Sequence, residues 1–82
     1  MFGTAYFIDG HTEPITSYHT NPNCTELYFA TNSGTYGYKE YITSDPCYTR
    51  NPFSSRCWNF YKYNNELNKW LVVINIEHIE IY

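Results

Sequence analysis

The chain has 82 residues, of which 43% are hydrophobic, 21% aromatic and 16% charged, and its formal net charge is −3. This length supports one domain with a single small core, which we place over residues 1–82. Disordered segments are poor in aromatic residues, so ten tyrosines, five phenylalanines and two tryptophans argue against disorder. The five lysines and arginines are scattered among eight acidic residues, which argues against direct binding to a nucleic-acid backbone.

Short β-branched and aromatic segments, separated by turn dipeptides, follow one another along the whole chain. The predicted strands, in chain order, are Thr4–Ile8, Ile15–His19, Glu26–Ala30, Thr35–Ile42, Trp58–Tyr63, Lys69–Ile76 and a short Ile79–Tyr82. No segment shows the apolar stripe and caps of an amphipathic helix. The sequence therefore predicts an all-β or nearly all-β fold, as a strongly curved antiparallel sheet or a partly closed barrel of about six strands.

The third and fourth predicted strands form a hairpin whose register can be derived from charge. A four-residue loop over Thr31–Gly34 sets Glu26 opposite Lys39, whereas a three-residue loop sets Glu26 opposite Glu40. Because opposite charges across a strand pair stabilise it and like charges do not, we predict the four-residue loop. It pairs Leu27 with Tyr38 and Phe29 with Tyr36, and these four side chains are predicted to face the core.

The last predicted strands require a change of register. Trp70, Val72, Ile74 and Ile76 alternate on one face, but Ile79 and Ile81 have the opposite parity. One extra residue near Glu77–His78 would return both sets to the core. The side chains for which we predict burial include Leu27, Phe29, Trp70, Val72, Ile74 and Ile79.

Metal binding and catalysis receive little support from the sequence. A zinc set of His19, Cys24, Cys47 and Cys57 lacks the close ligand pairs of structural zinc sites, since nine residues separate Cys47 from Cys57. A disulfide between these last two cysteines remains open. No nucleophile signature surrounds any cysteine or serine. We predict a protein with no metal, cofactor or catalytic residue.

The aromatic surplus is the strongest functional signal. One small core does not absorb all the rings, and tyrosine, tryptophan and arginine are enriched at protein interfaces. The long segment Ser44–Arg56 brings arginines and aromatic rings together among prolines, as in a recognition loop. The predicted binding residues are Tyr48, Arg50, Phe53 and Arg56, with Tyr28 and Tyr41 as flanking residues. The other aromatic residues counted in excess of the core are Tyr6, Tyr18, Trp58, Tyr61, Tyr63 and Tyr82.

No secretory signal is visible at the N-terminus, and the longest apolar run, Trp70–Ile74, is far shorter than the ~20 residues of a membrane span. We therefore expect a cytoplasmic protein with no membrane contact. The small size, mild acidity and lack of catalytic motifs resemble the class of phage-encoded inhibitors of bacterial immunity, such as anti-CRISPR proteins and nucleotide sponges. That resemblance implies residence in the cytoplasm of a host cell.

Two functions follow as hypotheses. The first is a non-catalytic protein that blocks a larger protein partner through a tyrosine-rich face and the Ser44–Arg56 loop. The second is a module that sequesters a small signalling nucleotide by stacking its base on aromatic rings, with Arg50 or Arg56 holding phosphate. The second hypothesis includes association of the chain with itself, which could form a pocket between subunits.

Overall fold

The computed structural model describes residues 1–20, 26–39 and 52–82, and the regular secondary structure in these ranges is all β-strand. The four-stranded sheet has the order β2 (Thr12–Ile15), β1 (Gly3–Phe7), β9 (Ile76–Ile81) and β6 (Phe53–Ser54). The five-stranded sheet has the order β3 (Ser17–Thr20), β4 (Glu26–Thr31), β5 (Gly34–Lys39), β7 (Asn59–Asn64) and β8 (Lys69–Val73). All neighbouring strands are antiparallel, which confirms the predicted fold class.

The two sheets do not close into a barrel, and the described ranges hold nine strands rather than about six. Two predicted strands are each divided between the sheets. The predicted strand Ile15–His19 breaks at Thr16, and the predicted strand Lys69–Ile76 breaks at Ile74–Asn75. The short β6 lies inside the segment that we predicted to be a loop. Local patterns show extended backbone, but they do not show which neighbour the backbone pairs with.

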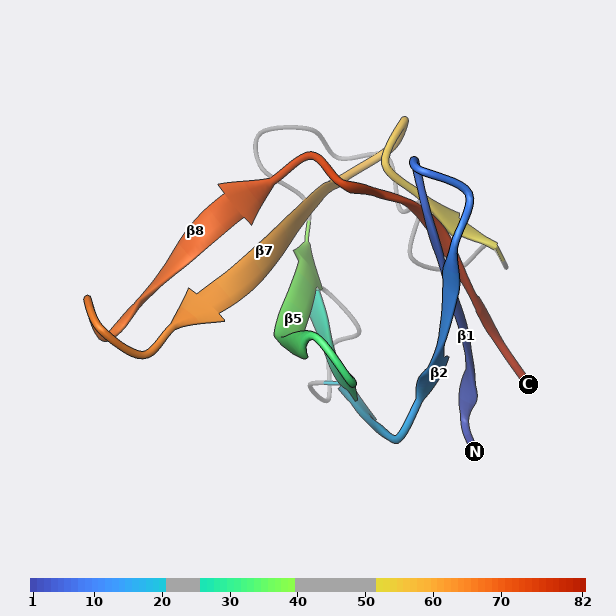
Figure 1. The fold of residues 1–82 in the computed structure, drawn as a ribbon, viewed down its shortest axis with the longest axis horizontal. Coiled ribbons are helices and arrows are strands. Elements are labelled where there is room, and N and C mark those ends of the chain that lie inside the picture. Colours follow the sequence, from blue (N-terminus) through green and yellow to red (C-terminus); the bar gives the residue numbers. More distant parts are fainter. Residues whose placement is uncertain (21–25, 40–51) are drawn as a thin grey trace.

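The chain changes sheet within one or two residues at these breaks. The carbonyl oxygen of Ile15 accepts a hydrogen bond from the N–H of Phe2, in the four-stranded sheet. The N–H of the following residue, Thr16, donates to the carbonyl oxygen of Ala30 in β4, in the five-stranded sheet. Figure 1 shows β1 and β2 on one side of the molecule and the β7–β8 hairpin projecting on the other, with β5 between them. The two sheets are therefore joined by continuous backbone, and the core lies between them.

The turns follow local chemistry. Gly10 has a φ of 95° in the β1–β2 turn, and its N–H donates to the carbonyl oxygen of Phe7. Asn68 has a φ of 53° in the β7–β8 turn, a region that asparagine enters more readily than most residues. The side-chain oxygen of Asn64 accepts a hydrogen bond from the N–H of Leu67 at 2.9 Å, which closes that turn.

The predicted hairpin register is confirmed. Leu27 pairs with Tyr38, Phe29 with Tyr36 and Glu26 with Lys39. The predicted loop length is wrong, because pairing continues to Thr31 and Gly34 and the turn has two unpaired residues, Asn32 and Ser33, instead of four.

The predicted extra residue near Glu77–His78 is confirmed as well. Tyr6 pairs with His78 and Phe7 pairs with Ile76, so Glu77 has no opposing residue on β1. This bulge places both Ile76 and Ile79 in the core, where they are 1% and 0% exposed.

Trp70, Val72 and Ile74 are not in the core, and that part of the prediction is wrong. Their exposed fractions are 37%, 54% and 85%. The alternation along this segment is real, but both of its faces are apolar, because Leu71 and Val73 fill the other one. The alternation therefore separated the two faces without showing which of them packs inward.

The core is built from stacked rings. Tyr38 is fully buried, and its ring lies 4.6 Å from that of Phe60 and 5.3 Å from that of Trp58. Its hydroxyl donates to the carbonyl oxygen of Ser54 in β6 at 2.8 Å. Tyr36 is equally buried, but its hydroxyl has no hydrogen-bond partner among the described residues.

These two tyrosines form a matched pair for a stability test. Tyr38→Phe should lower the free energy of unfolding by about 1 kcal/mol, because it removes a buried hydrogen bond, while the Ser54 carbonyl oxygen still accepts from the N–H of Cys57. Tyr36→Phe should be neutral or stabilising, because its hydroxyl is buried near the Ser33 side chain without a hydrogen bond of good geometry among the described residues. Chemical denaturation of both variants measures the difference. Equal losses in the two would contradict this account of the core.

Candidate binding surface

The five-stranded sheet carries an aromatic patch on the face that points away from the core. The register aligns Tyr28, Gly37, Tyr61 and Val72 in one row across β4, β5, β7 and β8. The neighbouring residues Leu27, Tyr38 and Phe60 point the opposite way, into the core. Tyr63 pairs with Trp70 two positions along from this row, on the same face. We call Tyr28, Tyr61, Tyr63 and Trp70 the outer aromatic face.

Gly37 positions two of these rings. A Cβ at this residue would lie 3.3 Å from the Tyr28 ring and 3.6 Å from the Trp70 ring. The two rings therefore lie close over the glycine, with their centroids 5.4 Å apart. A glycine inside a strand weakens the strand, and cover by neighbouring aromatic rings is a known compensation. Replacing Gly37 with a larger residue would push the two rings apart.

The remaining contacts extend the patch across the sheet. The rings of Tyr63 and Trp70 meet edge-on at 5.3 Å. The Lys39 ammonium lies 5.2 Å from the centre of the Tyr61 ring, which is a cation–π geometry. Burial raises the pKa of Tyr28, and the Glu26 carboxylate beside it raises it further.

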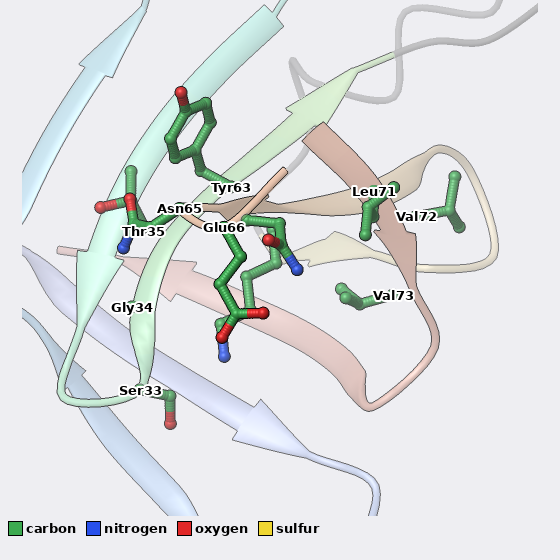
Figure 2. A pocket seen from close by; sticks show the side chains of 11 residues that line it. Ser33, Gly34, Thr35, Tyr63, Asn65, Glu66, Leu71, Val72 and Val73 are labelled. Atoms are coloured by element: carbon green, nitrogen blue, oxygen red, sulfur yellow. The ribbon is translucent and has the colours of Figure 1, made fainter. Parts of the chain in front are cut away.

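A cleft with a volume of about 590 Å³ lies between the β4–β5 turn and the β7–β8 hairpin, on the side of the hairpin that carries Lys62, Leu71 and Val73. Figure 2 shows Ser33, Gly34 and Thr35 on one wall, with Leu71 and Val73 across from them. Lys62 and Glu66 add one positive and one negative group to the lining. The cleft is open and mixed in polarity, so it presents no concentrated charge of one sign.

A second polar cluster joins the two sheets. The His11 ring lies between the carboxylates of Asp9 and Glu13. The distance from His11 Nε2 to the Glu13 carboxylate oxygen is 2.7 Å. Glu13 in turn accepts hydrogen bonds from the backbone N–H and hydroxyl of Ser33, in the β4–β5 turn. The Ser33 hydroxyl contacts Glu13 and not His11, so the cluster lacks the nucleophile–base contact of a hydrolase. Its evident role is to hold β2 against the five-stranded sheet.

The structure places the predicted binding residues apart. Tyr28 belongs to the outer aromatic face, and Arg56 is exposed in the turn after β6, on the other sheet. The prediction for Phe53 is wrong, because its ring is 7% exposed and lies edge-on to Tyr38 in the core. Tyr41, Tyr48 and Arg50 lie outside the described residues.

Trp70 was predicted to lie in the core, and the sequence patterns predicted no structural or binding role for Gly37. The signal that points to them is the isolated glycine inside a predicted strand, which marks a place where other groups approach the backbone closely. Tyr61 and Tyr63 were counted among the surplus rings. Without the β7–β8 register, nothing in the sequence placed them beside Trp70.

The described residues include no group of three or more His, Cys, Asp or Glu side chains arranged to hold a metal ion. Cys57 carries a free, half-buried thiol. Residues 1–20, 26–39 and 52–82 contain no helix that is long and apolar enough to cross a membrane. No protein-family model, curated protein or solved structure matches the chain.

The His11 cluster predicts how stability depends on pH. Hydrogen bonds to Glu13 and, to a smaller extent, to Asp9 raise the pKa of His11 above 6.5. The stabilisation of the fold by protonated His11 is therefore complete below pH 6.5 and is lost as the pH rises through the raised pKa. Burial of Glu13 acts to raise its pKa, but hydrogen bonds from Ser33 and His11 outweigh it and lower the pKa from 4.5 to about 2. Its stabilisation is complete above pH 4.5 and is lost as pH falls toward about 2.

The cluster should therefore contribute most between about pH 4.5 and pH 6.5. Melting temperatures of the wild type and of Glu13→Gln, measured from pH 3 to pH 9, test this, with Glu66→Gln in the β7–β8 turn as the control. The difference between wild type and Glu13→Gln should be largest in that window and shrink on both sides. A difference that is constant across the pH range would show that Glu13 acts by packing alone.

Proposed function

We propose that this chain is a non-catalytic binding protein that blocks a larger protein partner through the outer aromatic face. The observation that carries the proposal is the position of three large, at least partly exposed rings, Tyr28, Tyr63 and Trp70, on the side of the five-stranded sheet that faces away from the core. Tyr61, 8% exposed, fills the space between them. Stiff rings with polar edges give much contact area for little loss of conformational freedom. The face combines Tyr and Trp, two of the side chains most often found as binding hot spots.

The support beneath this face also suits binding. The strands that carry the rings pack their other side into the core through Leu27, Tyr38 and Phe60, each at most 1% exposed. A rigid scaffold keeps the bound geometry in the free protein, which reduces the entropy lost on association. Rings on a thin sheet can also serve stability alone, and the experiment below separates the two roles.

The resemblance to phage-encoded inhibitors of bacterial immunity indicates which partners to test first. We propose a host defence protein as the target, in the cytoplasm of the host. The immobilised chain would be exposed to purified bacterial immunity complexes and to a bacterial lysate, and bound material would be identified by native mass spectrometry. The partner found in this way then defines the affinity assay.

Tyr28→Ala and Tyr63→Ala should each weaken that affinity at least tenfold, or about 1.4 kcal/mol, because each removes one of the two rings that flank Trp70 on the face. Tyr82→Ala is the matched control, since Tyr82 is 72% exposed and lies outside the face. Calorimetry of binding and thermal melting would be measured on all three. If both face variants bind like the wild type, or lose affinity only in proportion to lost stability, the outer aromatic face is not the binding surface.

The cleft favours a second candidate, sequestration of a small nucleotide. Lys62 contributes to its lining and offers a cation for phosphate. A thermal-shift series with cyclic mononucleotides and dinucleotides tests this function. A shift that Lys62→Ala abolishes would favour it over a protein partner. No shift with any nucleotide would remove it.

A further inference from the structure

Strand β8 is one of the two edges of the five-stranded sheet, and it is apolar on both faces. The run Trp70–Ile74 contains no charge, and each of its side chains is at least partly exposed, with Ile74 at 85% and Val72 at 54%. One side of β8 pairs with β7, and in the described structure its other side has no strand beside it. Figure 1 shows this hairpin projecting from the rest of the fold. Such an edge is a template for pairing with another strand.

The other three edges of the described sheets are less suited to apolar pairing. Strand β2 contains Glu13 and Pro14, and proline cannot donate a hydrogen bond to a neighbouring strand. Strand β3 exposes polar residues, and β6 is only two residues long. Within β8 the single charge is Lys69, at its first position, and no proline or glycine interrupts it. The contrast within one molecule indicates that the β8 edge is left open for a partner.

We propose that the partner is a second copy of this chain, whose β8 pairs antiparallel with the first about a two-fold axis at Val72. In this register Leu71 of one copy faces Val73 of the other, and Trp70 faces Ile74, the first residue after the end of β8. The apolar run is bounded by Lys69 on one side and Asn75 on the other, which face each other across the pair. The polarity of the segment is thus symmetric about Val72, as an isologous contact requires and a foreign strand does not.

Other registers fit less well. An axis at Leu71 places Lys69 opposite Val73. An axis at Val73 pairs Trp70 with Ile76, which is already buried in the four-stranded sheet. An axis between two residues would oppose side chains that point to different faces. With the axis at Val72, the two Lys69 groups lie six residues apart along the pair, roughly 20 Å, so they do not repel each other strongly.

The consequence is a continuous ten-stranded sheet, twice the five-stranded sheet of one copy. Because a two-fold axis perpendicular to the sheet keeps each face on its own side, the two outer aromatic faces would join into one surface with Trp70 close to the axis. This inference does not depend on the proposed function. Tyr28 and Tyr63, which test partner binding, are not on β8, so the two proposals fail separately.

Sedimentation velocity of the full chain tests the dimer. The wild type should show twice the 9.8 kDa mass of one chain at micromolar concentration. Val72→Lys should weaken self-association at least 100-fold, because it places two ammonium groups opposite each other on the axis. Ile8→Lys is the matched control and should remain dimeric, since Ile8 is an exposed apolar residue, 62% exposed, in the β1–β2 turn. Circular dichroism and melting temperature would verify that each variant is folded.

A mixing experiment tests the register. Val72→Lys and Val72→Asp should each be monomeric alone, and an equimolar mixture should regain dimers, because only an axis at this residue sets position 72 opposite itself. The proposal is overturned if the wild type is monomeric up to about 100 µM, if Val72→Lys stays dimeric, or if the mixture stays monomeric. A monomeric wild type whose partner complex is lost in Val72→Lys would assign the edge to a foreign strand instead.

Discussion

The fold depends on the way in which Tyr38 joins the two sheets. Its ring packs against Phe53, Trp58 and Phe60, and its hydroxyl reaches the backbone of Ser54 in the four-stranded sheet. A small domain buries a modest fraction of its surface, so each buried ring carries a large share of the available stabilisation. Tyrosine in such a core must also satisfy its hydroxyl. Tyr38 does so at the point where the four-stranded and five-stranded sheets approach each other.

That arrangement determines which face of the five-stranded sheet remains available. Since successive residues of a strand point to opposite faces, burying Tyr38 and Phe60 sends Gly37 and Tyr61 outward. The outer aromatic face is therefore the direct counterpart of the aromatic core. On this face the rings of Tyr28 and Trp70 pack against each other and against the backbone of Gly37. They do not pack against the four-stranded sheet. Tyr28, Tyr63 and Trp70 keep exposed surface for contact with another molecule, whereas Tyr61 is 8% exposed.

Sequence patterns predicted the fold class, the β4–β5 register and the bulge at Glu77, because turn chemistry, cross-strand charge and side-chain parity are all local. They failed where the outcome depended on distant partners. Nothing within Ile15–His19 shows that Thr16 starts a second sheet, and nothing near Phe53 shows that its backbone pairs with Ile79. For the same reason the surplus of tyrosines could be counted, but Tyr61 and Tyr63 could not be placed beside Trp70 until β7 and β8 were paired.

Strand β8 differs from the other edge strands, which are polar, contain proline or are very short. The β7–β8 turn is polar, with Asn64, Asn65 and Asn68, as expected of a projecting loop, but the strand that follows is apolar on both sides. Natural sequences are locally consistent, and departures from that consistency tend to mark functional sites. An open apolar edge carries a risk of aggregation that a single charge would remove. The absence of such a charge from Trp70–Ile74 is best explained if a partner strand covers this edge.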